Sequence, residues 1–453
     1  MAAVLSLSRL SHSTQGALST SHLSHHPLLF QRRSQICQDI GSISAIWISP
    51  VMDLQVKYLW GLTPVASASL EKVQMFPNME KLSIRIGCSG SRARTFGVSA
   101  FISASAAEIS FEHASSLKDI KVVTPICERP AVHITCLEDL LQWVRKAQQL
   151  AASVGQQFYD TDGGPDSSDL LRELDWLLDD SLAACCQKRR DSDTFSQLNN
   201  QTTSAHVLLR ISIEELENQW VQRVKERRPF QYIVGCAHWR DLVLSVQEGV
   251  LIPRPETEQM IDLAEAAIMG NPSLAVGLWA DLGTGSGAIA IALARLLPSP
   301  GSVLAVDMSE TAVAVARRNV GHYALTDKVN VVHGSWFLSL EDQKGSLAGV
   351  ISNPPYIPSA NIAALQAEVG KHEPRTALDG GQDGMKDLQQ ICHGSALALR
   401  AGGFLALETN GGTQAEAVAD LLRNMNSPVT CFQNIKIVPD FAGICRFVTA
   451  IHC

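Results

Sequence analysis

The chain has 453 residues, of which 46% are hydrophobic and 18% charged, with a formal net charge of −8. This composition can bury a substantial core, which excludes an intrinsically disordered protein, and no run approaches the roughly 18 apolar residues of a membrane span. Residues 1–110 contain nine Lys and Arg against five Asp and Glu, so the remainder is acidic, with 28 against 40. An acidic body is a poor partner for phosphate backbones, which disfavours nucleic acid as the main substrate.

The eleven cysteines are scattered along the chain. Cys185 and Cys186 are adjacent, and neither C-x-x-C nor H-E-x-x-H spacing occurs. Such placement is typical of isolated thiols in a reducing compartment. We therefore predict no metal site and no structural disulfide.

The N-terminal region has the composition of a targeting segment. The first 38 residues contain no Asp or Glu, are rich in Ser and His, and include Arg9, Arg32 and Arg33. Residues 89–107 are again Ser- and Ala-rich without an acid. We predict that residues 1–110 are a transit peptide and disordered extension, with an ordinary disordered tail as the other interpretation. The Ser content favours the chloroplast (plastid stroma), with the mitochondrion as the alternative.

Residues 111–230 are predicted to form a helical substrate-recognition domain, because apolar residues recur there at helical spacing in three segments. Thr135 with Glu138, and Ser212 with Glu215, have the spacing of capping boxes at the first and third helices. Every patterned position is apolar, so packing explains the pattern better than a binding site does.

The period changes to two in residues 231–256, which predicts a β-hairpin linker. In residues 257–453, short strand-like runs alternate with helical ones. The expected strands are 277–281, 302–307, 329–332, 347–352, 403–408, 431–438 and 445–451, and the expected helices are 287–297, 310–320, 385–400 and 413–424. This alternation predicts an α/β fold with a mostly parallel, Rossmann-like seven-stranded sheet, to which the last two strands add an antiparallel edge.

A glycine-rich turn follows the first of these strands. Its candidate ligand-binding residues are Asp281, Gly283, Thr284, Gly285 and Gly287. Glycines let the backbone approach a ligand closely, but the spacing is G-x-G-x-G and not the dinucleotide-binding G-x-G-x-x-G. Asp307 ends the next strand, where it can accept hydrogen bonds from ribose hydroxyls, and Asp281 could face a cationic group such as an ammonium. A nucleoside ligand without a pyrophosphate fits best, and a tight turn with a strand-end cap is the alternative.

The sequence Asn353-Pro354-Pro355-Tyr356 follows the fourth expected strand of the same sheet. Ligands of open α/β sheets bind beyond the carboxyl ends of the strands, which places this loop beside the nucleoside. The Asn353 side-chain oxygen and the Pro354 carbonyl can accept both N–H bonds of a planar NH2 group and hold its nitrogen in line with a sulfonium methyl. Two prolines stiffen the loop, and Tyr356 can stack over the planar group.

Four further motifs accompany these two. They are Arg228–Gly235 (RPFQYIVG), Leu251–Glu258 (LIPRPETE), Glu373–Gly381 (EPRTALDGG) and Asp440–Val448 (DFAGICRFV). With them, the chain from about Thr135 to Val448 resembles the HemK-type protein-(glutamine-N5) methyltransferases, the family of release factor glutamine methyltransferases. The first 110 or so residues have no counterpart in that family.

The resemblance implies a class I methyltransferase sheet that binds S-adenosyl-L-methionine through Gly283, Gly285 and Asp307, with Trp336 near the adenine. It further implies that Asn353 and Pro354 hold the substrate glutamine amide, that Tyr356 lines its pocket and that Arg254 shapes the entrance. The implied substrate is the Gly-Gly-Gln glutamine of an organellar class I peptide chain release factor. Many relatives have an acidic residue where this chain has Ser335, which leaves the adenine amine contact open.

The sequence also allows plainer interpretations of Arg254 and of the Asn-Pro-Pro-Tyr loop. Arg254 could simply pair with Glu256 or Glu258 instead of shaping an entrance. The Asn-Pro-Pro-Tyr loop is shared with nucleic-acid N-methyltransferases that act on adenine N6 or guanine N2, and a non-catalytic cofactor-binding protein could keep the same fold. The acidic body and the LIPRPETE motif favour a protein glutamine.

Overall fold

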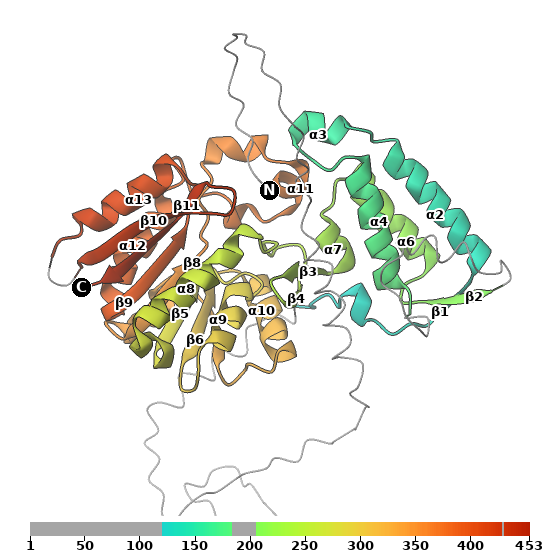
Figure 1. Cartoon of the computed structure of the whole chain (residues 1–453). Helices are drawn as coiled ribbons and strands as arrows, with labels where there is room; N and C mark the ends of the chain where they lie inside the picture. The colour runs from blue at the N-terminus through green and yellow to red at the C-terminus, as the bar shows by residue number, and fades with distance from the viewer. Residues whose placement is uncertain (1–119, 184–204, 428–429) are drawn as a thin grey trace, which may run out of the picture. The chain divides into compact units, whose positions relative to one another are not determined.

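The computed structural model describes residues 120–183, 205–427 and 430–453 (Figure 1). The transit peptide and extension predicted for residues 1–110 lie outside the described residues. The first described elements are η2 (Ile126–Glu128), β1 (His133–Cys136), α2 (Leu137–Ala152), α3 (Gln157–Asp162), α4 (Ser167–Ser181), β2 (His206–Leu209), α6 (Ile213–Lys225) and α7 (Phe230–Val234). The helices share one apolar core that includes Leu140, Leu174 and Trp220, and β1 pairs antiparallel with β2. We call these elements the helical module.

Two of its helix starts have side-chain caps. The Asp166 carboxylate accepts hydrogen bonds from backbone amides in the first turn of α4. Of the capping box predicted at Ser212 and Glu215, only one half forms: the Ser212 hydroxyl accepts from the Glu215 amide at 3.1 Å, while the Glu215 carboxylate pairs with Arg129. The capping box predicted at Thr135 is wrong. Thr135 lies within β1, and α2 begins at Leu137, whose amide donates to the Ala205 carbonyl at 2.9 Å, so strand pairing takes the place of a cap.

The remaining elements form a hairpin and a large sheet with its helices (Figure 1). They are β3 (Cys236–Trp239), β4 (Leu242–Ser245), η3 (Glu256–Glu258), α8 (Gln259–Gly270), η4 (Pro272–Val276), β5 (Leu278–Leu282), α9 (Ala288–Leu296), β6 (Ser302–Asp307), α10 (Glu310–His322), β7 (Val329–His333), η5 (Leu338–Gln343), β8 (Leu347–Ser352), η6 (Ser359–Ala364), α11 (Ala367–His372), η7 (Arg375–Ala377), α12 (Lys386–Ala398), β9 (Leu399–Glu408), α13 (Thr413–Asn424), β10 (Phe432–Pro439) and β11 (Cys445–His452). The β3–β4 hairpin is antiparallel, as expected of the linker. Helix α8 is an element that the sequence patterns did not reveal.

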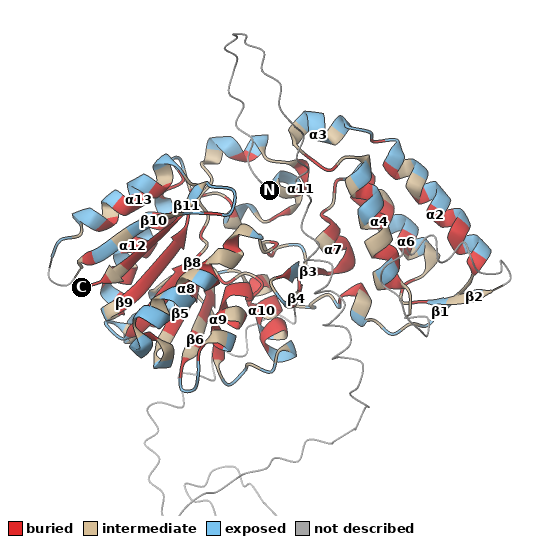
Figure 2. Ribbon diagram, in the orientation of Figure 1, coloured by how far each residue is buried: buried red, intermediate tan, exposed pale blue. Residues whose placement is uncertain are grey.

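The large sheet has the strand order β10-β11-β9-β8-β5-β6-β7. Strands β9, β8, β5, β6 and β7 are parallel, and β11 runs antiparallel to both β9 and β10, which confirms the predicted Rossmann-like sheet and its antiparallel edge. Side chains alternate between two cores. Helices α8, α9 and α10 pack on one face and α12 and α13 on the other, so the central strands are buried on both sides (Figure 2).

The strand order reverses between β5 and β8. From β5 the chain proceeds outward to β6 and β7, and it then returns to β8 on the other side of β5. Crossovers that leave two neighbouring strands in opposite directions open a crevice at their carboxyl ends, and ligands of such sheets bind there. The fold therefore brings the loops after β5, β6 and β8 to one site.

A buried network of charges joins the helical module to α11. Arg223 donates hydrogen bonds to Glu173 at 2.6 Å and to Glu368 at 3.0 Å. Arg227 donates to both oxygens of Glu368 and to Asp162 at 3.0 Å. The side chains of the two arginines are only 3% and 8% exposed, so these ion pairs lie largely out of water. We call these five residues the arginine network.

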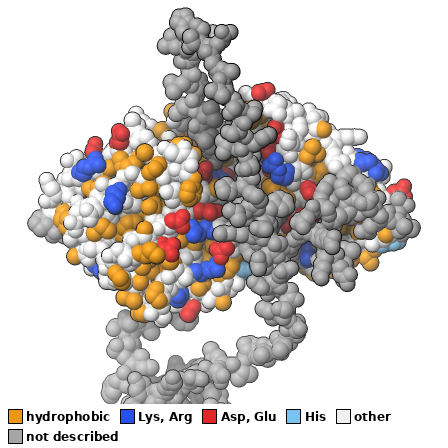
Figure 3. All heavy atoms as spheres, viewed as in Figure 1, with side chains coloured by type: hydrophobic (Ala, Val, Ile, Leu, Met, Phe, Trp, Pro, Cys, Tyr) orange, Lys and Arg blue, Asp and Glu red, His pale blue; other side chains and the backbone are white. Residues whose placement is uncertain are grey.

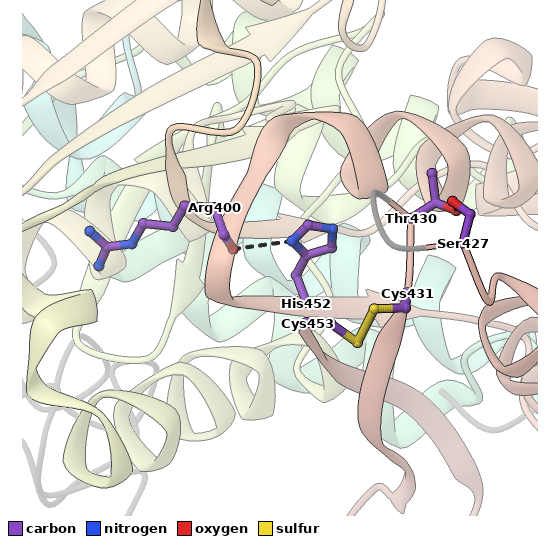
Figure 4. Close-up of a disulfide and its surroundings, with 6 residues drawn as sticks. All are labelled: Arg400, Ser427, Thr430, Cys431, His452 and Cys453. Carbon is purple, nitrogen blue, oxygen red and sulfur yellow. Dashed lines mark hydrogen bonds between the residues drawn. A yellow bond between two sulfur atoms is a disulfide. The ribbon is translucent and has the colours of Figure 1, made fainter.

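Cys431 and Cys453 form a disulfide at the open end of the β10–β11 hairpin (Figure 4). The prediction of no structural disulfide is therefore wrong. The register of the hairpin places Phe432 opposite His452, which brings the two flanking Cα atoms to 5.5 Å, within the usual range for a disulfide. Sequence spacing alone does not reveal this proximity.

Within the described ranges, no helix is long and apolar enough to cross a bilayer. In the same part of the chain, no group of three or more His, Cys, Asp and Glu side chains is arranged to hold a metal ion.

Candidate active site

A cavity of about 520 Å³ lies at the carboxyl ends of β5, β6 and β8. This volume is typical of a site for a small organic ligand. Of the residues predicted to act, its walls include Arg254, Gly283, Thr284, Gly285, Asp307, Trp336, Asn353 and Pro355. Gly287, Asp281, Pro354 and Tyr356 do not belong to the walls.

The glycine turn is folded back over the end of β6. The amides of Gly283 and Thr284 both donate to the Val306 carbonyl, and Gly285 donates to the Asp307 carboxylate at 2.9 Å. Gly283, Gly285 and Gly287 all have positive φ, which favours glycine. Gly287 precedes α9 and packs near Ala316, so its role is to form the turn.

Asp307 borders the cavity at the end of β6. Its two carboxylate oxygens accept hydrogen bonds from the amides of Gly285 and Ser309, each at 2.9 Å, and its side chain borders the cavity. Burial raises its pKa, while these amide bonds lower it. A carboxylate has about four lone-pair sites, so Asp307 can still accept hydrogen bonds from a diol such as that of a ribose.

Asp281 does not face the cavity, contrary to the expectation of contact with a cationic ligand group. It is fully buried beneath the glycine turn, where one carboxylate oxygen accepts from the Thr284 hydroxyl at 2.6 Å and from the Ala290 amide at 3.0 Å. The side chain therefore fastens the turn to α9. Burial raises the pKa of Asp281 to about 7.

Trp336 follows β7 and forms a flat wall of the cavity. A Cβ added at Gly283 would lie 3.4 Å from its ring, so the glycine allows the turn and the indole to approach each other. Asp387, at the start of α12, also lines the cavity; burial raises its pKa, while the Lys386 charge and an interaction with Trp336 act in the lowering direction. Sequence reasoning missed Asp387, which supplies a carboxylate beside Trp336 where Ser335 cannot.

Asn353 leaves the end of β8 and borders the cavity beside the glycine turn. Its Nδ2 donates to the Thr257 hydroxyl at 3.1 Å, and no donor among the described residues bonds to its Oδ1. A Cβ on Gly283 would lie 3.9 Å from the Asn353 carbonyl oxygen, so the loop directly adjoins the turn. The Asn353 Oδ1 atom is therefore a hydrogen-bond acceptor without a donor in the described part of the protein, in a loop that adjoins the glycine turn.

Tyr356 occupies a different position from the one expected. Its hydroxyl donates to the buried Glu408 carboxylate at 3.2 Å, and its carbonyl accepts from Gln414 at 2.9 Å. Burial, together with the nearby Glu408 charge, raises the pKa of Tyr356. The phenol therefore anchors the loop to the end of β9 instead of lining the cavity.

Arg254 borders the cavity and pairs with Glu373 at 2.6 Å. It does not pair with Glu256 or Glu258, the partners that the plainer interpretation suggested. Glu373, 1% exposed, also accepts a hydrogen bond from the Ile252 amide. The LIPRPETE and EPRTALDGG motifs thus meet at the rim of the cavity.

Comparison with known proteins agrees with this geometry. The family described as Methyltransferase small domain matches residues 258–370. The chain is 39% identical over 314 residues to the release factor glutamine methyltransferase of Synechocystis, which covers 69% of this chain and 96% of that protein. It is 48% identical over 235 residues to the protein of the same name from Gloeobacter violaceus, covering 52% of this chain and 78% of the relative. The chain is an S-adenosylmethionine-dependent methyltransferase, and it belongs to the release factor glutamine methyltransferase family.

Proposed function

We propose that this enzyme transfers the methyl group of S-adenosylmethionine to the side-chain amide nitrogen (N5) of the glutamine in the Gly-Gly-Gln motif of organellar class I peptide chain release factors. The observation that carries the proposal is the position of Asn353. Its nitrogen is bonded to Thr257, and the loop that bears it adjoins the glycine turn. The names of the relatives support a release factor as the substrate.

The chemistry needs orientation more than acid–base catalysis. The nitrogen of a carboxamide is a poor nucleophile because its lone pair is delocalised. Asn353 Oδ1, which borders the cavity, would accept one of its N–H bonds and point the nitrogen at the methyl carbon. When bound, S-adenosylmethionine would supply the methyl group from its sulfonium and leave as a neutral thioether, and the amide nitrogen would lose one proton to water.

The charge of the protein bears on the class of substrate. Beyond residue 110 the chain has 28 basic against 40 acidic residues. On the described surface visible in Figure 3, Lys and Arg side chains lie singly or beside acidic ones and form no continuous stripe. A nucleic-acid substrate would need such a stripe to neutralise phosphates, so this surface favours a protein acceptor.

The experiment uses purified enzyme and methyl-labelled cofactor with three acceptors: a release factor, the same factor with its Gly-Gly-Gln glutamine changed to glutamate, and nucleic acid. Label is expected on the first acceptor alone. Asn353→Ala should abolish transfer while calorimetry still detects cofactor binding, since the cofactor residues on the glycine turn and Asp307 are unchanged. Label that enters DNA or RNA but not the release factor would overturn the proposal.

We further propose that the enzyme acts in the chloroplast. Support comes from the acid-free, Ser-rich first 38 residues, whose composition is that of a transit peptide. The full chain fused at its C-terminus to a fluorescent protein should enter plastids. Accumulation in mitochondria would select the alternative organelle, and a cytosolic signal would contradict an organellar substrate.

A further inference from the structure

The Asn353 side chain can act as an acceptor only if its oxygen, and not its NH2 group, faces the substrate. The two ends of a carboxamide have nearly the same shape, so shape alone does not select the orientation. The neighbouring Thr257 hydroxyl selects the orientation of the Asn353 amide. It carries one hydrogen, which it donates to Glu408 at 2.7 Å, so only its lone pairs remain for Asn353. A lone pair can bond the NH2 end of Asn353 and not the oxygen.

The three residues come from separate segments that the fold brings together. Thr257 lies in η3, Asn353 follows β8, and Glu408 ends β9. Thr257 and Glu408 are 4% and 1% exposed, so water does not compete for these bonds. An ionised carboxylate only accepts hydrogen bonds, and the hydroxyls of Thr257 and Tyr356 each donate to one of its oxygens. The ionised Glu408 carboxylate therefore sets the donor and acceptor roles in the two hydrogen bonds that run from Asn353 to Thr257 and from Thr257 to Glu408.

We propose that Thr257 and Glu408 are positioning residues, which hold Asn353 with its side-chain oxygen directed at the amide that accepts the methyl group. The inference rests on the proposed function, because it presumes an acceptor with N–H donors. Thr257 borders the cavity and Glu408 does not, and the proposed effect of both on the acceptor amide passes through Asn353. Thr257 acts on Asn353 directly, and Glu408 acts through Thr257.

Protonation of Glu408 would disturb this arrangement. A protonated carboxyl is itself a donor, and a Thr257 hydroxyl that accepts from it is free to donate to Asn353, which favours the reversed amide. Burial raises the pKa of Glu408 to about 7. Three charged or titratable groups surround Glu408. Arg446 in β11 lowers the pKa of Glu408, as does the hydrogen bond from Tyr356 in the Asn-Pro-Pro-Tyr loop, whereas Glu256 in η3 raises it. Arg446 also pairs with Asp440 at 2.9 Å.

The test compares Thr257→Val, Thr257→Ser and Glu408→Gln with the wild type. Valine keeps the shape of threonine but removes the hydroxyl, so we expect kcat for methylation of the release factor to fall roughly 10- to 100-fold, with the affinity for S-adenosylmethionine unchanged. Serine keeps the hydroxyl and should restore most of the rate. A residue with a merely structural role would change the melting temperature and cofactor affinity together with the rate, and the serine variant would give no selective rescue of kcat.

The pH profile provides the second measurement. In the wild type, kcat should rise as pH passes through about 7 and Glu408 ionises. Glu408→Gln keeps an oxygen for Thr257 but cannot ionise, so this rise should disappear. A wild-type kcat in Thr257→Val, or a full pH rise in Glu408→Gln, would overturn the positioning role. If the wild-type enzyme instead leaves the release factor unmodified, the proposed function itself fails, which is a distinguishable result.

Discussion

In the arginine network, we expect the loss of Arg227 to destabilise the protein more than the loss of the charge on Glu368. It contains two positive and three negative side chains, so the loss of a positive charge and the loss of a negative charge have different consequences. Arg227→Met keeps most of the apolar stem but leaves one arginine among three carboxylates. Glu368→Gln leaves two arginines, each still paired with its own carboxylate, Glu173 or Asp162.

The contacts set the magnitudes. Arg227 makes three charge-assisted hydrogen bonds and lies 4.2 Å from the centre of the Phe158 ring. Removing one partner of such a buried pair costs about 3–5 kcal/mol of unfolding free energy, the range expected for Arg227→Met. A glutamine at position 368 can still offer one acceptor oxygen, so we expect a loss of about 1–2 kcal/mol there.

The assay is chemical denaturation at neutral pH, with Asp420→Asn as the matched control. Asp420 also pairs with an arginine, Arg423, but the two side chains are 66% and 52% exposed, so neutralising the pair should cost about 0.5 kcal/mol or less. The reasoning is refuted if Glu368→Gln destabilises the protein as much as Arg227→Met, because the cost would then not follow the balance of charge.

Three further predictions concern the sheet and the cavity. Asp307→Ala should weaken S-adenosylmethionine binding roughly 10- to 100-fold in calorimetry, since hydrogen bonds to a charged acceptor contribute about 1.5–3 kcal/mol each; unchanged affinity would place the ribose elsewhere. Because burial raises the pKa of Asp281 from 3.8 to about 7, the folded protein holds this proton more tightly than the unfolded chain does and loses stability as pH rises through that window. The unfolding free energy of Asp281→Asn, measured relative to wild type, should therefore increase between about pH 4 and pH 7, and a difference that does not vary with pH contradicts this. Cys453→Ser opens a cross-link with a sequence separation of 22 residues, so it should lower the unfolding free energy by about 3 kcal/mol in oxidising buffer and by nothing once a thiol reductant is added to both proteins.

The sequence predicted the sheet well because its signals are local. Each strand is a short β-rich run bounded by glycine, proline or a helical segment, and the expected 347–352 and 302–307 coincide with β8 and β6. Helix α8 was missed because its sequence, QMIDLAEAAIMG, lies between a proline-rich motif and the first strand and shows no single apolar stripe.

The site was predicted only in part, because some contacts join residues far apart in the chain. Thr257 and Glu408 are separated by 151 residues, and nothing in either local sequence indicates that they share a hydrogen bond. For Asp281, the position at a strand end was correct, but a strand-end carboxylate can face either the ligand or the protein interior. Burial under the turn decided between the two, and burial is a property of the packed fold.

The reversal of strand order has a consequence for how enzymes of this architecture diversify. The glycine turn, Asp307 and Trp336, where we expect S-adenosylmethionine to bind, follow β5, β6 and β7, whereas Asn353 follows β8 and is held by residues in η3 and at the end of β9. Mutations near Asn353, in η3 or at the end of β9 can therefore alter which molecule is methylated, while the residues that follow β5, β6 and β7 remain unchanged. Substitutions on the acceptor side could therefore change the substrate, in evolution or by design, while the residues expected to bind S-adenosylmethionine are retained.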